Sequence, residues 1–151
     1  MDENVLIPVK RRMNMGKTPG RDAMHSEHSL DGLKVLLAED DPLNIIFAQK
    51  ILSGWDIEVA IARNGLIAVE MAKKAIFDII LMDIQMPEMD GLAASIAIKK
   101  FKPKIPIIVL SSYISEQMQE DFNDAGITDF MSKPIDKVHL HSILVKNVLK
   151  K

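Results

Sequence analysis

The chain has 151 residues, 48% of them hydrophobic, and a formal net charge of −2 at pH 7. This length and apolar content allow one globular domain with a hydrophobic core. The net charge is too small to indicate nucleic-acid binding. The chain has no cysteine, which excludes disulfides, thiolate catalysis and cysteine-bound zinc. The apolar runs are short and no signal-peptide pattern is present, so we expect a soluble cytoplasmic protein that does not insert into a membrane.

Residues 1–31 differ in composition and apolar pattern from the rest of the chain. They contain helix and strand breakers such as Pro8 and Gly20 but no sustained apolar periodicity. We therefore expect a flexible N-terminal extension or linker over residues 1–31 and a folded domain over residues 32–151. The segment VLIPVKRR (5–12) is alternatively a short strand, the last of a preceding domain.

Short apolar segments alternate with helix-forming segments from Leu33 onward. In chain order the sequence predicts a strand at 34–38, a helix at 41–54, a strand at 57–62, a helix at 63–75, a strand at 78–83, a helix at 90–101, a strand at 104–112, a helix at 115–126, a strand at 127–132 and a helix at 136–151.

The first predicted helix shows typical signals. Leu43, Phe47 and Ile51 stand at helical spacing, Pro42 lies in the first turn and Gly54 ends the helix. Three polar residues, Asp41, Asn64 and Asp90, are the expected N-caps of the first three helices.

Five strand–helix units with strands apolar on both faces indicate an α/β fold. Such strands form a parallel sheet covered by helices on both sides, and right-handed crossovers give a three-layer sandwich. Sites in open parallel sheets form beyond the carboxyl ends of the strands. That edge is expected to carry Glu39, Asp40, Asp41, Asp83, Ser111, Ser112 and Lys133.

This set of side chains fits phosphoryl transfer. Carboxylates that are brought together repel one another and need a cation, and oxygen ligands of this kind suit Mg²⁺. Asp83 would be the nucleophile, because a carboxylate that attacks a phosphoryl group forms an aspartyl phosphate. Glu39 and Asp40 would hold the metal, and Ser111 and Lys133 would bind the phosphoryl oxygens.

Each acid also has a simpler explanation when it is taken alone. Asp41 before Pro42 is expected to cap a helix, and acids in general favour helix N-termini. Asp83 alone could be a turn residue. The functional interpretation depends on the four groups falling together at the carboxyl ends of four different strands.

Four segments resemble the signature blocks of the receiver domain of two-component response regulators, and the resemblance covers about residues 33–150. They are VLLAEDDPLN (35–44), ILMDIQMPEMDG (80–91), IPIIVLSS (105–112) and FMSKP (130–134). The resemblance implies a flavodoxin-like (βα)5 sandwich whose five-stranded parallel sheet has the order 2-1-3-4-5.

The resemblance also assigns the acids around the metal. It makes Asp83 the phosphoacceptor and Glu39 with Asp40 the magnesium-binding pair, and Gln85 would offer its backbone carbonyl to the ion. Glu39 stands where many members of the family have aspartate. Gln85 and Tyr113 occupy positions expected to tune the rate of dephosphorylation.

The remaining matched positions concern the phosphoryl group and the switch. Ser111 matches the hydroxyl residue that follows the phosphoryl group, and the neighbouring Ser112 stands where a small alanine is common. Lys133 matches the lysine that contacts the phosphoryl group, and the Lys133–Pro134 peptide bond is expected to be cis. Phe130 occupies the aromatic switch position.

The resemblance implies a phospho-accepting switch. A phosphohistidine of a histidine kinase or histidine phosphotransfer protein would donate to Asp83 with Mg²⁺. The surface formed by the fourth helix, fifth strand and fifth helix would then change. We expect a monomer or weak dimer without direct nucleic-acid binding, and no catalysis beyond the domain's own phosphorylation and dephosphorylation.

The origin of the chain stays open between a stand-alone receiver and a piece of a larger protein. The segment DIQMPEMDG and the N-terminal extension are most like receivers fused to hybrid sensor histidine kinases, so tethering to a membrane-bound kinase is one expectation.

Two other classes of function remain as alternatives. A phosphohydrolase of the haloacid dehalogenase kind also uses an aspartate nucleophile and Mg²⁺, but it would need a second acid where Gln85 stands. The other alternative is a phosphorylation-independent interaction domain on the same fold, and the complete set of polar site residues argues against it.

Overall fold

The computed structural model describes residues 30–127 and 129–149. The extension expected over residues 1–31, including the segment VLIPVKRR, therefore lies outside the described residues apart from its last two positions. The first of these, Leu30, is buried and belongs to the hydrophobic core. Within the described residues no helix is long and apolar enough to cross a membrane.

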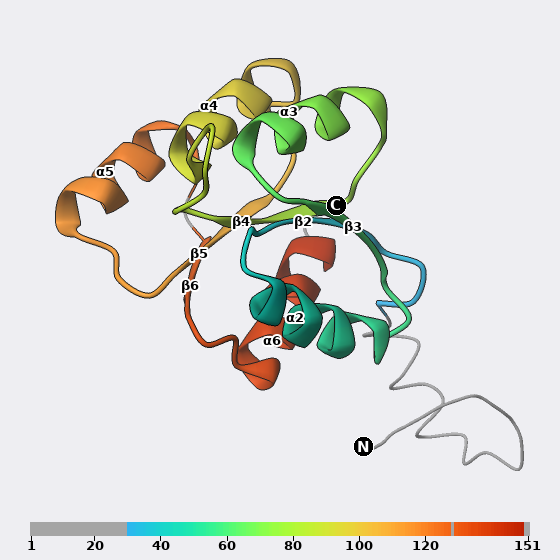
Figure 1. Cartoon of the computed structure of the whole chain (residues 1–151). Coiled ribbons are helices and arrows are strands. Elements are labelled where there is room, and N and C mark those ends of the chain that lie inside the picture. Colours follow the sequence, from blue (N-terminus) through green and yellow to red (C-terminus); the bar gives the residue numbers. More distant parts are fainter. Residues whose placement is uncertain (1–29, 128, 150–151) are drawn as a thin grey trace, which may run out of the picture.

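Strands and helices alternate through the described part of the chain (Figure 1). In order they are β2 (Lys34–Ala38), α2 (Pro42–Ser53), β3 (Glu58–Ala62), α3 (Gly65–Lys74), β4 (Ile79–Asp83), α4 (Gly91–Phe101), β5 (Ile107–Ser111), α5 (Glu116–Asp124), β6 (Asp129–Ser132) and α6 (Lys137–Leu149).

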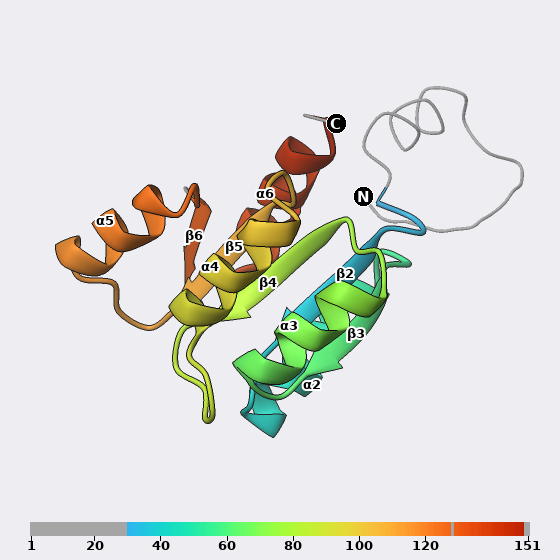
Figure 2. The same cartoon turned by 90° about the horizontal axis from the view of Figure 1, so that it is seen from above.

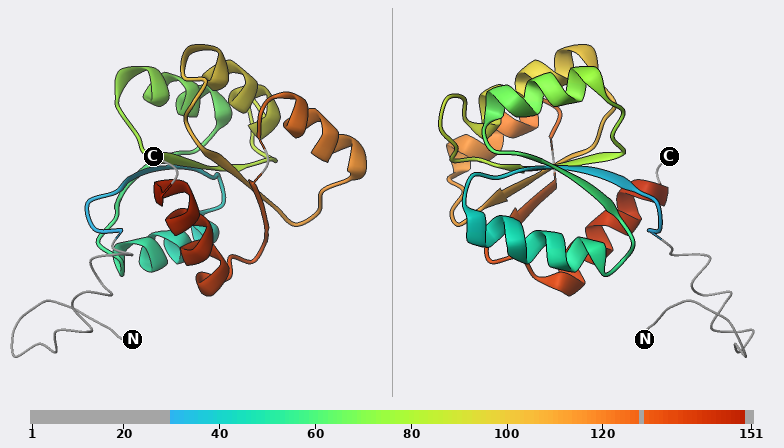
Figure 3. Two further views of the ribbon diagram at one scale, coloured as in Figure 1. Left: turned by 180° about the vertical axis from the view of Figure 1, so that it is seen from behind. Right: turned by 45° about the vertical axis from the view of Figure 1, so that its right-hand side comes forward.

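The strands form one parallel sheet in the order β3-β2-β4-β5-β6. Counted along the chain this is the order 2-1-3-4-5, so the predicted flavodoxin-like topology is confirmed. Helices α3, α4 and α5 cover one face of the sheet and α2 and α6 cover the other, as the two views in Figure 3 show. The predicted three-layer sandwich is confirmed as well.

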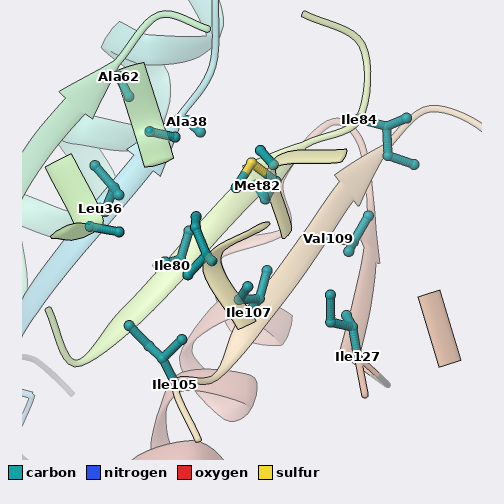
Figure 4. Packing of buried hydrophobic residues seen from close by; sticks show 14 of the residues in the cluster. Leu36, Ala38, Ala62, Ile80, Met82, Ile84, Ile105, Ile107, Val109 and Ile127 are labelled. Carbon is teal, nitrogen blue, oxygen red and sulfur yellow. The ribbon is translucent and has the colours of Figure 1, made fainter. Parts of the chain in front are cut away.

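Side chains of each central strand alternate between two core clusters. Leu36 and Ala38 of β2 point to the cluster under α3, α4 and α5, and Val35 and Leu37 point to the cluster under α2 and α6. The pleat of a strand causes this alternation, and β4 and β5 follow it too (Figure 4). A strand that faces two cores is apolar at every position, which is why the sequence predicted a sheet covered on both sides.

The predicted helix caps are confirmed. A carboxylate oxygen of Asp41 accepts a hydrogen bond from the amide of Leu43 at 3.0 Å, and Oδ1 of Asn64 accepts one from Ile67 at 2.8 Å. Asp90 caps α4 in the same way, with 2.8 Å to the amide of Ala93. Each cap satisfies a backbone donor that the helix itself cannot pair, so the helix start is fixed locally.

The side of α2 that faces the sheet differs from the spacing noted in the sequence. Leu43 is 76% exposed and Phe47 is 48% exposed, whereas Ile45, Ala48 and Leu52 are buried. Apolar residues surround most of this helix, so spacing alone does not select the buried side. The packing against β2, β3 and α6 makes that selection.

Strand β5 begins later than predicted. Residues 104–106 were expected to belong to it, but the strand starts at Ile107. Pro106 has no backbone N–H to donate, although its carbonyl accepts a hydrogen bond from Ile80 at 3.0 Å. The residues at the carboxyl end of β5, which matter for the site, are unaffected.

Candidate functional site

The predicted site residues lie together at the carboxyl edge of the sheet. Glu39 and Asp40 directly follow β2, Asp83 ends β4, Ser111 ends β5 and Lys133 follows β6. The parallel register places these strand ends side by side, with Asp83 paired to Leu110 and Ser111 to Ser132. The edge is therefore built from segments that are far apart in the sequence.

Three carboxylates converge at this edge. One oxygen each from Glu39, Asp40 and Asp83 lies within 4.8 Å of the others. Glu39 is 2% exposed and Asp83 is 5% exposed, while Asp40 is exposed to solvent. Two buried acids and one open acid offer hard oxygen ligands with room for water, and this donor set fits Mg²⁺.

The ammonium group of Lys133 lies between the two buried carboxylates. Its Nζ is 2.8 Å from Oε1 of Glu39 and 3.1 Å from Oδ1 of Asp83. The second carboxylate oxygen of Glu39 accepts a hydrogen bond from the amide of Asp41 at 3.2 Å. Lys133 thus bridges the two buried acids and places its positive charge beside both.

The electrostatics of the pair are asymmetric. Burial and, to a lesser extent, the nearby charge of Glu39 raise the pKa of Asp83, and Lys133 opposes both effects, so that the pKa moves from 3.8 to about 6. Burial alone would lower the pKa of Lys133, but its bonds to Glu39 and Asp83 outweigh burial and raise that pKa. At pH 7 Asp83 is therefore mainly an ionised carboxylate, although it is buried.

The hydroxyl of Ser111 is bonded within its own loop. It donates to the carbonyl of Tyr113 at 2.6 Å and accepts from the amide of Tyr113 at 3.1 Å. Ser111 is buried, while the adjacent Ser112 is exposed. Ser111 is thus in the predicted place beside Asp83, with its hydroxyl engaged by backbone.

The loop between β4 and α4 carries Gln85 and turns tightly at Gly91. The amide of Gly91 donates to the carbonyl of Ile84 at 2.8 Å. A Cβ atom on Gly91 would meet the carbonyl of Asp83 and lie 2.9 Å from Cα of Ile84, so only glycine allows this approach. Within residues 30–127 and 129–149 the carbonyl of Gln85 accepts no hydrogen bond, so it has a free lone pair for an ion.

Two further predicted positions flank the site. Phe130 is half-buried and meets the buried Phe122 edge-on, with ring centroids 5.8 Å apart and an interplanar angle of 79°. The peptide bond between Lys133 and Pro134 is cis.

Some features of the site have no signature in the sequence. The bond between Lys133 and Glu39 joins residues 94 positions apart, and only the fold brings them together. The partner of the Ser111 hydroxyl is the backbone of Tyr113, which any residue at that position would supply. Gly65, the first residue of α3, donates its amide to the carbonyl of Met89 in the β4–α4 loop at 3.0 Å. Its neighbour Asn64 was noted only as a helix cap.

Together the fold and the site define an α/β domain with a cluster of three carboxylates, two of them buried, and a lysine at one sheet edge. The response regulator receiver domain model matches residues 35–145, so the chain belongs to the receiver domain family of two-component signalling.

Curated and solved relatives agree with this family. The transcriptional regulatory protein ZraR of Escherichia coli (strain K12) is 34% identical over 116 residues, which cover 77% of this chain and 26% of ZraR. The receiver domain of the sensor histidine kinase PA1611 from Pseudomonas aeruginosa PAO1 has a magnesium ion coordinated in its active-site cleft. It is 30% identical with a TM-score of 0.72, and the match covers 78% of this chain and 98% of that one.

A second solved receiver comes from a histidine kinase. It is the signal receiver domain of a signal transduction histidine kinase from Syntrophus aciditrophicus, 30% identical with a TM-score of 0.69, and the match covers 79% of this chain and 91% of that one. The matches span between 18% and 26% of the length of these curated relatives.

Proposed function

We propose that this receiver domain accepts a phosphoryl group on Asp83 from a phosphohistidine. A carboxylate oxygen of Asp83 forms the new bond to phosphorus while the bond from phosphorus to the donor imidazole nitrogen breaks. The imidazole leaves with the electron pair of that bond and takes up a proton. Asp83 fits this role because it is buried and ends strand β4 at the carboxyl edge of the sheet.

Each neighbour of Asp83 has a role in this proposal. Lys133, 3.1 Å from Oδ1 of Asp83, binds a phosphoryl oxygen and offsets its charge. Ser111 exchanges its bonds to the backbone of Tyr113 for a bond to another phosphoryl oxygen. Phosphoryl oxygens carry negative charge and are stronger acceptors than a neutral carbonyl, which favours that exchange.

Glu39, Asp40, Asp83 and the backbone carbonyl of Gln85 would hold Mg²⁺. The convergence of three carboxylates within 4.8 Å supports this assignment, because such a cluster is repulsive without a cation. When bound, the ion would neutralise charge on the phosphoryl oxygens during transfer.

The donor and the output are inferred from the class of domain. We infer a histidine kinase or histidine phosphotransfer protein as donor, since both present a phosphohistidine. Solved receivers of histidine kinases at 30% identity support a hybrid kinase as the parent protein, with the domain on the cytoplasmic side, and a transcriptional regulatory protein at 34% identity supports a response regulator equally. The output surface is α5, β6 and α6, because Ser111 leads into α5 and Phe130 lies in β6 next to Phe122.

The single observation that carries the proposal is the contact of Asp83 with Lys133 inside the carboxylate cluster. The test is incubation with acetyl phosphate or phosphoramidate, with and without Mg²⁺, and detection of one phosphoryl group by intact mass. The natural protein should be labelled only with Mg²⁺, and Asp83→Asn should not be labelled.

Asp90→Asn is the matched control, because Asp90 is an exposed cap in the same loop and asparagine caps equally well. This variant should be labelled like the natural protein. Full Mg²⁺-dependent labelling of Asp83→Asn would overturn the assignment. Failure of the natural protein to bind Mg²⁺ or beryllofluoride would favour the phosphorylation-independent interaction domain, and steady turnover of phosphate esters would favour the hydrolase.

A further inference from the structure

The loop that carries Gln85 packs Met86 and Met89 against the core and receives one hydrogen bond from outside its own strand and helix. Within the described ranges, one hydrogen bond connects residues 85–90 to an element other than β4 or α4, from the amide of Gly65 to the carbonyl of Met89 at 3.0 Å. Figure 2 shows the start of α3 lying beside this loop where it projects past the end of β4. Gly65 is the first residue of α3.

Gly65 also has no space for a side chain. A Cβ atom there would overlap the carbonyl oxygen of Met89 and lie 2.9 Å from its carbonyl carbon and 3.0 Å from its Cβ. The obstacle is mainly backbone, so no rotation of a flexible side chain relieves it. Ordinary contact starts at 3.4 Å, so any larger residue must push the Met89 backbone away by at least about 0.5 Å.

The rest of the loop transmits such a movement. Its backbone is already tightly turned, because the amide of Met89 donates to the carbonyl of Pro87 at 2.7 Å and Glu88 has a left-handed φ of 69°. The amide of Gly91 closes the loop on Ile84. The loop is short and tightly turned between Asp83, at the end of β4, and Met89. A displacement of Met89 therefore also moves the backbone carbonyl of Gln85.

We propose that Gly65 is a positioning residue for the metal site. It does not touch the ion; it sets the place of the β4–α4 loop and through it the place of the Gln85 carbonyl. Mg²⁺ requires near-ideal octahedral geometry and tolerates little displacement of a ligand. Residues that orient metal ligands indirectly typically change metal affinity by about 10-fold to 100-fold when they are altered. The inference rests on the proposed metal site.

The experiment is isothermal titration with Mg²⁺ alone on the natural protein, Gly65→Ala and Asn64→Ala. Asn64→Ala is the matched control, because it removes the cap of the same helix, where Oδ1 of Asn64 bonds the amide of Ile67 at 2.8 Å, but adds no atom against Met89. We expect Gly65→Ala to bind Mg²⁺ about 10-fold or more weakly. Asn64→Ala should lose thermal stability and keep its Mg²⁺ affinity within about 2-fold.

A measurement on the natural protein keeps the inference testable if Gly65→Ala folds poorly. Saturating Mg²⁺ should slow amide hydrogen exchange at Gly65 more than at Gly54, whose amide bonds the carbonyl of Lys50 at 3.2 Å in α2 and serves as an internal reference. If Mg²⁺ slows amide exchange at both glycines by the same factor, the inference is wrong.

The outcomes separate two kinds of failure. If the natural protein does not bind Mg²⁺, the proposed metal site is wrong and the role of Gly65 fails with it. If the natural protein binds Mg²⁺ and folded Gly65→Ala binds it equally well, the metal site stands and only the role of Gly65 is wrong.

Discussion

Replacing Asp83 by asparagine should stabilise the fold at neutral pH. The pKa of Asp83 is raised from 3.8 to about 6, which means that the folded protein holds its ionised form unfavourably. A difference of about two pKa units, at 1.36 kcal/mol per unit, corresponds to roughly 3 kcal/mol. Asparagine has nearly the same shape and no charge, and Lys133 keeps its bond to Glu39 at 2.8 Å. We expect a gain of about 1 to 3 kcal/mol in the free energy of unfolding at pH 7.

The gain should depend on pH in a defined direction. Because the folded-state pKa of Asp83 lies above 3.8, the folded protein binds the proton more tightly than the unfolded chain does. The stability of the natural protein therefore falls as pH rises from about 4 to above 6. Asp83→Asn lacks this loss, so its advantage should be small near pH 4 and complete near pH 7.

The assay is urea unfolding of the natural protein and Asp83→Asn at several pH values without divalent cations. Taking the difference between the two proteins cancels the titration of the groups that do not interact with Asp83. Asp90→Asn is the control for loss of one exposed negative charge and should change stability by no more than about 0.5 kcal/mol. A difference that does not vary with pH, or an Asp83→Asn variant that is less stable at pH 7, would refute the reasoning.

Two other substitutions test the surroundings of the site. Lys133→Met removes the cation between Glu39 and Asp83. Urea unfolding at pH 7 should therefore show a free energy of unfolding that is lower by about 1 to 3 kcal/mol, and Mg²⁺ should partly restore it. An unchanged stability would mean that the two acids do not need that charge. Ser95→Ala removes a fully buried hydroxyl that has no hydrogen-bond partner in the described part of the chain. Thermal unfolding should therefore show a free energy of unfolding that is higher by about 0.5 to 1.5 kcal/mol. A decrease would indicate that the hydroxyl has a partner.

The sequence predicted those parts of the site that follow from strand order. A buried strand that ends in an acid places that acid at the sheet edge, so Asp83 and Glu39 could be assigned before the structure was known. The buried side of α2 could not be chosen, because Leu43 and Phe47 are as apolar as Ile45. Propensity and spacing describe one segment at a time, and contacts between segments require the packed fold.

The contacts around the site are also contacts between segments, so the sequence alone did not predict them. The closest contact of Lys133 is with Glu39, at 2.8 Å, and a sequence contains no distance between two strand ends. Likewise, the left-handed Glu88 and the close approach of Gly65 to Met89 are properties of the folded loop. The sequence could name glycine at position 65 but not the backbone that it makes room for.

The charges at the sheet edge explain why Lys133 alone does not neutralise the carboxylate cluster. Glu39, Asp40 and Asp83 bring three negative charges when all are ionised, and Lys133 supplies one positive charge. The remaining two negative charges match a divalent cation, and the exposed Asp40 leaves that ion an open approach from solvent. A phosphoryl group on Asp83 adds further negative charge, so the site then needs both cations and an additional donor. Ser111 ends the neighbouring strand β5, and its hydroxyl can donate to that group only by releasing the backbone of Tyr113. This exchange links the chemistry at Asp83 to the loop that leads into α5.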